Sequence, residues 1–266
     1  MRKVLWMADG GTKDHLLQQA DYIRAQAVCI RTDYDWLAGA ITEIKNKGFS
    51  VYAWRWPACR RYVPPPGGKI PPHWFADDEA AYVITLINAG LDGYIADPED
   101  DNHQDHQDWN YQDPNQSPTN AELAVRFCDT IKIAGRKKTP NFLFGLTSGN
   151  RYPQGKPNIP WPEFVAHSDA LYPQCYWWAD GSIENGGTAQ SAYDFGMNSW
   201  RKIAPASMTI VPIIGHITQP GDGSEIAAFQ KIIDANKLTE VHIYTCSDGA
   251  LDPRFKANWD AFRNLS

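Results

Sequence analysis

The sequence predicts a single α/β domain over residues 1–266, a closed (β/α)8 barrel of parallel strands wrapped by helices. Short apolar or β-rich runs alternate with amphipathic stretches along the whole chain and form about eight strand–helix units. The length of 266 residues is close to the usual size of one such barrel. A doubly wound open sheet is the competing fold, but no glycine-rich phosphate-binding turn follows the first predicted strand.

Each strand is predicted where a run is continuously apolar or rich in β-branched and aromatic residues, as strands covered on both faces should be. In chain order the predicted strands are 4–8, 27–31, 50–56, 93–97, 141–147, 170–177, 208–215 and 240–246. The helices between them are predicted from apolar residues at helical spacing. In chain order, clear examples are Leu16 with Ala20 and Ile23, Leu37 with Ile41 and Ile44, Val83 with Leu86, Leu123 with Phe127 and Ile131, Ile226 with Phe229 and Ile233, and Phe255 with Trp259 and Phe262.

Several of these helices carry start or stop signals. Gly48, Gly90 and Gly135 each follow the last apolar residue of a helical stretch, which is where helices commonly end. Asp222 with Glu225 three residues later predicts a capping box at the start of the helix before the last strand. Three strand-to-helix connections are long, 57–76, 99–118 and 148–160, and in a parallel barrel such loops build the binding sites.

Composition and charge exclude several classes of partner. The net charge is −6, and no basic cluster exceeds Arg136-Lys137-Lys138, so we expect neither a nucleic acid nor an anionic membrane as partner. No apolar run approaches the roughly 20 residues that span a bilayer. The apolar run after Met1-Arg2-Lys3 is shorter than a signal-peptide core, which predicts a cytoplasmic protein at synthesis. The five cysteines lack CxxC spacing and predict neither disulfides nor a zinc site.

The most informative stretch is the fourth predicted strand, which ends in Asp97 and Glu99. Residues two apart on a strand share a face, so these carboxyl groups lie about 5–7 Å apart by strand geometry. Two acids this close do not both ionise freely, and one tends to hold a proton. A protonated acid beside an ionised one is suited to breaking a glycosidic bond.

Other polar and aromatic residues follow the ends of the remaining predicted strands. Because one barrel mouth gathers all strand ends, they are candidates for binding a substrate there. The candidates are Asp9, Arg31, Arg55, Trp56, Gln174, Trp178, His216 and Asp248. The chain holds 11 Trp, several of them near strand ends, where an indole face can stack on a sugar ring. This combination predicts a polysaccharide as the partner.

A resemblance to a known family supports this prediction. The pattern Asp92-Gly93-x-x-x-Asp97-x-Glu99 resembles the DGxDxDxE motif of family 18 glycoside hydrolases, the chitinase-like TIM barrels, and Gln174-Cys175-Tyr176 resembles the Gln-x-Tyr of its plant-type branch. The resemblance implies that Glu99 is the general acid, that Asp97 orients the N-acetyl group of the substrate, and that Tyr176 hydrogen-bonds that group. Ile95 stands where the family has its middle Asp.

Lysozymes of family 25 provide a second resemblance. They also combine an Asp after the first strand, an Asp-x-Glu after a middle strand and an Asp near the last strand, a layout that Asp9, Asp97, Glu99 and Asp248 match. Both resemblances imply hydrolysis of β-linked N-acetylhexosamine polymers, peptidoglycan or chitin, without a cofactor. An enzyme acting on cell wall would then need a phage or secretion route of release. The alternative is a catalytically silent barrel that serves as a carbohydrate-binding or assembly module.

Two further patterns are weaker. The segment 100–108 is rich in Asp and His, but its spacing matches no EF-hand or zinc template, so we interpret it as a solvated loop and expect no metal. Ser247, His216 and Asp248 could assemble a hydrolase triad, yet no Gly-x-Ser-x-Gly turn supports one.

Overall fold

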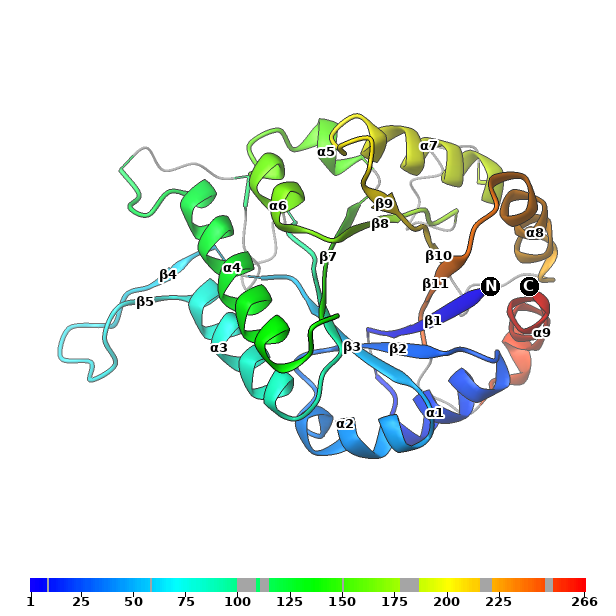
Figure 1. Ribbon diagram of the computed structural model, residues 1–266, viewed down its shortest axis with the longest axis horizontal. Coiled ribbons are helices and arrows are strands. Elements are labelled where there is room, and N and C mark those ends of the chain that lie inside the picture. Colours follow the sequence, from blue (N-terminus) through cyan, green and yellow to red (C-terminus); the bar gives the residue numbers. More distant parts are fainter. Residues whose placement is uncertain are drawn as a thin grey trace.

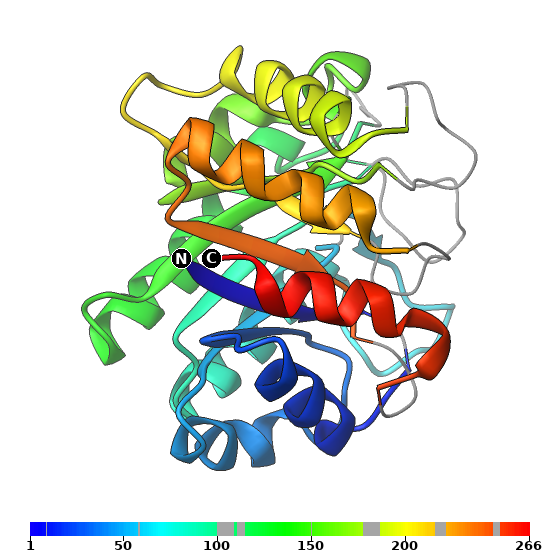
Figure 2. The same ribbon diagram turned by 90° about the vertical axis from the view of Figure 1, so that its right-hand side faces the viewer.

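The chain forms a closed barrel of parallel strands with helices around it, as a computed structural model shows (Figure 1). The structure describes residues 1–8, 10–57, 59–99, 109–110, 115–149, 151–177, 187–215, 222–246 and 251–266. The predicted (β/α)8 fold is confirmed. The two termini lie side by side (Figures 1 and 2), and Lys3 Nζ donates to the carbonyls of Phe262 and Arg263 at 2.8 and 2.9 Å.

The barrel strands follow one another around the sheet in sequence order. They are β1 (Arg2–Met7), β2 (Ala27–Arg31), β3 (Ser50–Arg55), β6 (Gly93–Ala96), β7 (Leu143–Gly149), β8 (Ala170–Gln174), β9 (Thr209–Ile210), β10 (Ile213–Gly215) and β11 (Glu240–Tyr244). Strand β10 pairs with both β8 and β11, which closes the barrel. The seventh predicted strand, 208–215, is therefore two segments. They are separated at Val211 and Pro212, where proline has no N–H to give to the ladder.

The helices pack around the outside of the strands (Figure 1). They are α1 (Lys13–Tyr22), α2 (Leu37–Asn46), α3 (Phe75–Asn88), α4 (Asn120–Lys138), α5 (Tyr152–Gly155), α6 (Trp161–His167), α7 (Ala189–Arg201), α8 (Ser224–Asn236) and α9 (Lys256–Asn264), with a 3-10 turn η2 (Pro253–Phe255). Among the described parts of the chain, no helix is both long and apolar enough to cross a membrane.

The capping box predicted from Asp222 and Glu225 is not formed. Gly223 takes the N-cap position of α8 in a left-handed conformation, with φ of 77°, and a glycine has no side chain to cap with. Asp222 instead accepts the N–H of Ser224 at 2.9 Å, and Glu225 accepts the N–H of Ala189 at 2.7 Å. Glu225 thus caps the neighbouring helix α7 rather than its own.

The long connection 57–76 contains an antiparallel hairpin. Strand β4 (Arg61–Tyr62) pairs with β5 (His73–Trp74), and the hairpin projects beyond the helices (Figure 1). The rings of Tyr62 and His73 stack across it with centroids 4.8 Å apart. The connection is therefore an ordered excursion of the chain.

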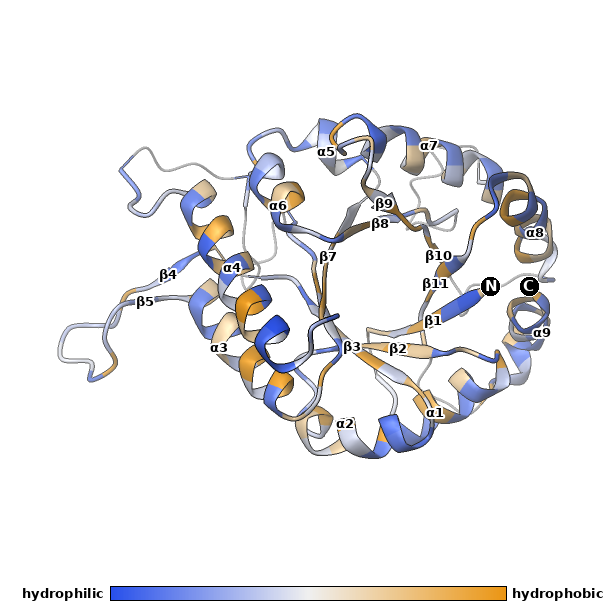
Figure 3. Ribbon diagram, in the orientation of Figure 1, coloured by the Kyte–Doolittle hydropathy of each residue, from blue (hydrophilic) through white to orange (hydrophobic). Residues whose placement is uncertain are grey.

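Alternate residues on the strands divide the apolar core into two parts. Tyr94 of β6 faces outward and meets Phe127 of α4 and Phe144 of β7. Ile95, its neighbour, faces the barrel interior, where it belongs to a cluster with Trp6 and Trp54. The helices carry apolar stripes toward the strands and polar residues outward (Figure 3). Asp97 follows Ile95 by two residues, so the strand places it on the interior side as well.

The amino-terminal half of the barrel interior holds a chain of buried polar contacts. Trp6 Nε1 donates to His242 Nδ1 at 2.8 Å, and His242 Nε2 lies 2.9 Å from Glu240 Oε1. Arg2 pairs with the other oxygen of Glu240 at 2.6 Å. Because Nδ1 of His242 accepts a hydrogen bond, the imidazole is neutral with its proton on Nε2. Every polar atom of this histidine is thereby satisfied within the interior.

Candidate active site

Asp97 lies inside the barrel at the carboxyl end of β6. Its backbone N–H donates to the carbonyl of Arg55 at 2.9 Å, which continues the pairing of β6 with β3 beyond the last strand residue. The side chain is only 2% exposed. Gln174 Nε2 lies 3.3 and 3.2 Å from its two oxygens, and the indole N–H of Trp56 also donates to it. A buried carboxyl group is thus held by donors from two other strands.

Glu99 forms a hydrogen bond with the Asp97 carboxyl group. Burial first, and then the charge and hydrogen bond of Glu99, raise the pKa of Asp97 well above its usual range. The donors Gln174 and Trp56 favour the ionised carboxylate and oppose this rise. The negative charge of one carboxyl group disfavours ionisation of the other, so the two groups titrate as a pair.

The backbone around Glu99 is fixed by buried neighbours. Ser148 Oγ donates to the carbonyl of Pro98 at 2.8 Å, and the N–H of Trp109 donates to the carbonyl of Glu99 at 3.3 Å. Trp109 is fully buried, and its indole N–H donates to the carbonyl of Pro57. These contacts hold the backbone that carries Glu99 beside Asp97.

The second predicted motif also follows the strand alternation. Gln174 and Tyr176 lie on the interior side, where Gln174 contacts Asp97 and Tyr176 packs against the interior cluster, and Cys175 between them is fully buried. Burial raises the pKa of Tyr176 well above its usual value, with further contributions from Tyr244, Asp97 and Glu99. The structure therefore brings Gln174 and Tyr176 together with the two carboxyl groups.

Tyr244, at the end of β11, belongs to the same group and was not among the residues predicted from the sequence. Its ring stacks on Tyr176 with centroids 5.1 Å apart and an interplanar angle of 29°. Gly215 lies beside both residues, since an added Cβ would be 2.8 Å from the Tyr244 carbonyl and 3.4 Å from the Tyr176 ring. An aromatic residue near the end of the last predicted strand, 240–246, was the available signal, because strand ends meet at one mouth.

Arg31 and Trp56 lie together at the mouth. The guanidinium carbon of Arg31 is 5.7 Å from the Trp56 ring centroid and 5.9 Å from that of Tyr34. Arg31 Nε also donates to Asp33 at 2.7 Å. Arg31 therefore covers the indole that donates to Asp97.

Arg55 occupies a different place. It precedes Trp56 on β3, so its side chain points away from the interior, where it lies 3.5 Å from Asp33 and 3.9 Å from Glu79 of α3. Glu79 accepts hydrogen bonds from Thr32 and Tyr94 at 3.0 and 3.1 Å, and burial raises its pKa. The structure thus does not bring Arg55 to the pair of Asp97 and Glu99. Arg55 lies instead near Asp33 and Glu79, outside the barrel interior.

The other predicted contacts, Asp9, Trp178, His216 and Asp248, lie outside the described residues, as do segment 100–108 and Ser247. Within the described ranges, no three His, Cys, Asp or Glu side chains are arranged to hold a metal ion.

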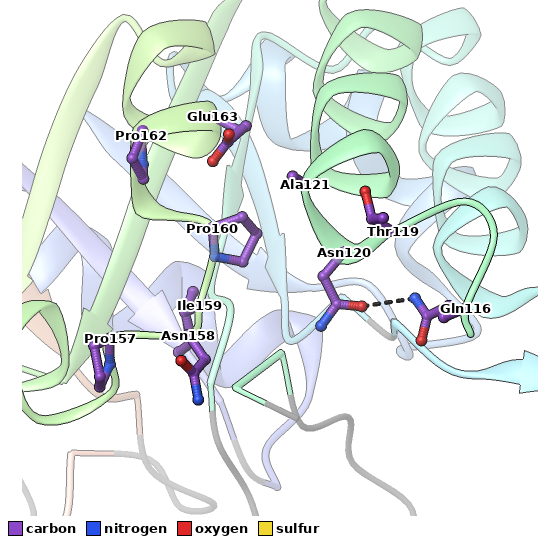
Figure 4. A pocket seen from close by; sticks show the side chains of 10 residues that line it. All are labelled: Gln116, Thr119, Asn120, Ala121, Pro157, Asn158, Ile159, Pro160, Pro162 and Glu163. Atoms are coloured by element: carbon purple, nitrogen blue, oxygen red, sulfur yellow. Dashed lines mark hydrogen bonds between the residues drawn. The ribbon is translucent and has the colours of Figure 1, made fainter. Parts of the chain in front are cut away.

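A cavity of about 400 Å³ lies at the same end of the barrel, between the start of α4 and the segment before α6 (Figure 4). Gln116, Asn120 and Glu163 contribute polar groups, and Pro157 and Pro160 contribute apolar ones. Asn120 Nδ2 donates to the carbonyl of Trp109 at 3.1 Å. Trp109 in turn donates to the Glu99 carbonyl, so one residue lies between the cavity lining and the Glu99 backbone.

No protein-family model matches the sequence, and no curated protein matches it. Solved structures do resemble it. The ICChI chitinase from Ipomoea carnea is 12% identical with a TM-score of 0.57, over 100% of both chains. The glycoside hydrolase domain of PelA from Pseudomonas aeruginosa is 10% identical with a TM-score of 0.54, over 93% of this chain and 96% of that one. A putative deoxyribose-phosphate aldolase from Toxoplasma gondii is 13% identical with a TM-score of 0.54, over 100% and 95%. At these identities the likeness shows the barrel fold alone.

Proposed function

We propose that this protein is a glycoside hydrolase that cleaves β-linked N-acetylhexosamine polymers of the chitin or peptidoglycan type. Glu99 is the general acid, Asp97 orients and stabilises the N-acetyl group of the substrate, and Tyr176 hydrogen-bonds that group. The observation that carries the proposal is the buried Asp97 carboxyl group inside the barrel, contacted by Gln174 and interacting with Glu99.

The closeness of the two carboxyl groups supports a substrate-assisted reaction. Glycosidases that use one carboxyl group as acid and another as nucleophile or base hold the two about 5–5.5 Å or about 6.5–9.5 Å apart, on opposite sides of the bond. Asp97 and Glu99 are hydrogen-bonded to each other, so they cannot flank a glycosidic bond in that way. The acetamido oxygen of the substrate is then the nucleophile, which is why an N-acetylated sugar is proposed.

The proton of the pair serves the departure of the leaving group. Asp97 holds it in the resting site, because burial and the neighbouring carboxylate raise its pKa. When the acetamido N–H of the substrate engages Asp97, the ionised form of Asp97 is favoured and the proton passes to Glu99. Glu99 then protonates the glycosidic oxygen, and Asp97 stabilises the positive charge that develops on the acetamido group.

The comparisons support the proposal by analogy only. A chitinase and a glycoside hydrolase domain are among the barrels of similar shape, but a protein described as a putative aldolase is as well. The residues at the mouth therefore carry more weight than the fold.

The silent-module alternative has one observation in its favour. Ile95 fills the interior position where a carboxyl group would otherwise assist Asp97, and it belongs to the apolar cluster with Trp6 and Trp54. In this protein Gln174 and Trp56 contact Asp97 instead.

Turnover of a chromogenic chito-oligosaccharide and of purified peptidoglycan distinguishes the two functions. The proposal expects release of product from at least one of them. Binding of oligosaccharide without any release from either substrate would establish the silent module.

A further inference from the structure

We propose that the cavity between α4 and the segment before α6 is a subsite that binds one uncharged N-acetylhexosamine unit of the glycan, away from the bond that is cleaved. This inference rests on the proposed function and extends it to the recognition of a longer chain.

The size and lining of the cavity fit one sugar unit. Its volume of about 400 Å³ is near the lower end of the range for ligand pockets, about 300–1,000 Å³. Three proline rings, Pro157, Pro160 and Pro162, lie on one side, and the amide groups of Gln116 and Asn120 lie on the other (Figure 4). A hexosamine presents an apolar C–H face on one side of its ring and polar groups around its rim, so it matches both sides.

The charges around the cavity select an uncharged unit. Of the described residues that line it, Glu163 is the one ionisable side chain, and no Lys or Arg accompanies it. An anionic sugar would meet the Glu163 carboxylate without a cation to pair with. A carboxylate accepts hydrogen bonds from sugar hydroxyl groups. The Asn120 amide accepts from Gln116 and donates to Trp109, so the amide groups of Gln116 and Asn158 are the ones that would bond the acetamido group.

The cavity is connected to the candidate catalytic acid through one buried residue. Asn120, which is 8% exposed, donates to the carbonyl of Trp109 at 3.1 Å, and the N–H of Trp109 donates to the carbonyl of Glu99 at 3.3 Å. Both walls of the cavity follow the carboxyl ends of β6 and β7, the end at which Asp97 lies. The cavity and the carboxyl pair therefore lie at the same end of the barrel with the buried Trp109 between them, and a long glycan would reach the cavity by passing over this residue.

Chain-length dependence of binding tests the subsite. The ligands are the dimer and the hexamer of β-1,4-linked N-acetylglucosamine, titrated by calorimetry into the Glu99→Gln protein so that they are not consumed. A subsite that engages only the longer ligand should make the hexamer bind roughly tenfold more tightly than the dimer. Ala121→Trp, added in this protein, fills the cavity and should reduce that advantage to about twofold or less. Pro162→Trp blocks the opposite wall and should act in the same way.

Ile133→Trp is the matched control, because Ile133 lies on the same helix α4 and is 68% exposed away from the cavity. It should keep the full advantage of the hexamer. Circular dichroism verifies that each variant is folded. Loss of the tighter hexamer binding in either folded blocking variant, Ala121→Trp or Pro162→Trp, is enough to support the subsite. An absent advantage in the Glu99→Gln protein, or one that persists in the folded blocking variants, overturns the subsite.

Two further measurements separate the proposals from each other. Hydrolysis by the wild type is assayed independently. If the hexamer binds more tightly than the dimer and the blocking variants remove this difference, but no hydrolysis occurs, the proposed chemistry is wrong and the subsite stands. If hydrolysis occurs but the hexamer binds no more tightly than the dimer, the subsite alone is wrong. The fully deacetylated glucosamine hexamer, which is cationic, should bind more weakly than the acetylated one. If it binds more tightly and Ala121→Trp removes that gain, Glu163 forms a cation site and the uncharged assignment is wrong.

Discussion

The indole N–H of Trp56 donates a hydrogen bond to the carboxyl group of Asp97, in addition to the two contacts that Gln174 makes at 3.2 and 3.3 Å. These neutral donors favour the ionised carboxylate, while burial and Glu99 favour the protonated form. These opposing influences together set how readily the Asp97 carboxyl group ionises.

Glu99→Gln should reduce hydrolysis by a factor on the order of 10² to 10⁴, the usual contribution of general acid catalysis. Glutamine has the same shape as glutamate, but it cannot donate the proton that the leaving oxygen needs. The measurement is kcat on a chromogenic chito-oligosaccharide, together with the affinity for an uncleaved oligosaccharide. Affinity should change little. Near-full activity would place the acid elsewhere, with Asp9 and Asp248 as the next candidates.

Asp97→Asn should abolish hydrolysis and yet raise stability at alkaline pH. A carboxyl group whose pKa is raised by folding binds more protons in the folded state than in the unfolded state, at pH values between its usual 3.8 and the raised value. The unfolding free energy of the wild type therefore falls as pH rises through that interval, by up to about 1.4 kcal/mol per pH unit. Asparagine does not titrate, so it removes this pH-dependent contribution to the unfolding free energy. Its side-chain oxygen can still accept hydrogen bonds from Gln174 and Trp56.

Thermal denaturation at pH 5 and pH 8 checks this prediction. The melting temperature of the Asp97→Asn protein minus that of wild type should be larger at pH 8 than at pH 5. Asp92→Asn is the matched control at the other end of β6, where Asp92 pairs with Lys45 at 2.6 Å and accepts the Val51 N–H. It should not gain at pH 8. The same behaviour in both variants would contradict the assignment of the raised pKa to Asp97.

Strand alternation explains which parts of the site the sequence could predict. Asp97 and Gln174 are predicted at the barrel mouth because they end predicted strands, and Tyr176 is implied there by the family resemblance; the structure places all three on the interior side. Arg55 and Trp56 were both predicted at the mouth, although adjacent residues on a strand point to opposite sides. Strand alternation predicts that only one of the two faces the interior. It does not predict which one, because that depends on the register of β3 against its neighbouring strands, which is a tertiary property.

The contacts of Asp97 could not be predicted for a related reason. Its donors come from β3 and β8, and neither strand is adjacent to Asp97 in sequence. The break in the seventh strand, in contrast, had a visible signal in Pro212, because proline cannot donate within a ladder. The barrel itself followed from the alternation of strands and helices, a pattern that is repeated along the whole chain.

Trp56→Phe should shift the pH dependence of hydrolysis. Phenylalanine keeps an aromatic ring under Arg31 but lacks the indole N–H, so the pKa of Asp97 should rise further and the alkaline limb of the profile should move to higher pH. The maximal rate should fall, because Asp97 loses one contact that orients it. Trp54→Phe is the control, since the Trp54 N–H donates to the carbonyl of Met7 at 3.0 Å. It should lower stability and leave the alkaline limb in place; an equal shift in both variants would contradict the role of Trp56.

Two helical glycines should respond in opposite directions to alanine. Helix α4 continues through Gly135 to Lys138, so the helix stop predicted at Gly135 is wrong. A Cβ added at Gly135 would lie 2.2 Å from the Phe142 ring, which cannot move without disturbing the core, so Gly135→Ala should destabilise by about 1–3 kcal/mol. Gly39 in α2 has nothing within 4 Å of the added atom, and Gly39→Ala should stabilise by about 0.5–1 kcal/mol. Chemical denaturation of both variants measures the difference. Equal effects would show that the packing of Phe142 on Gly135 is not as described.

Acidification should destabilise the fold through His242 before it affects Glu240. Burial lowers the pKa of His242 below its usual 6.5, so the unfolded state binds more protons once pH falls through 6.5, and stability decreases from there. Protonation of Nδ1 would also break the hydrogen bond from Trp6. Contacts with His242 and Arg2 lower the pKa of Glu240 to about 2 against the opposing effect of burial, so its contribution is lost only as pH falls from about 4.5 toward 2.

His242→Gln isolates the first of these steps. A glutamine can accept from Trp6 and donate to Glu240 without titrating, so the variant should lose less stability than wild type between pH 7.5 and pH 5.5, by on the order of 1 kcal/mol. Its stability at pH 7.5 should be lower, because the imidazole ring that packs on Tyr172, with centroids 4.4 Å apart, is gone. His167→Gln, at a partly exposed pair with Asp129, is the control and should leave the wild-type slope nearly unchanged. A slope in His242→Gln as steep as in wild type would assign the acid sensitivity to another group.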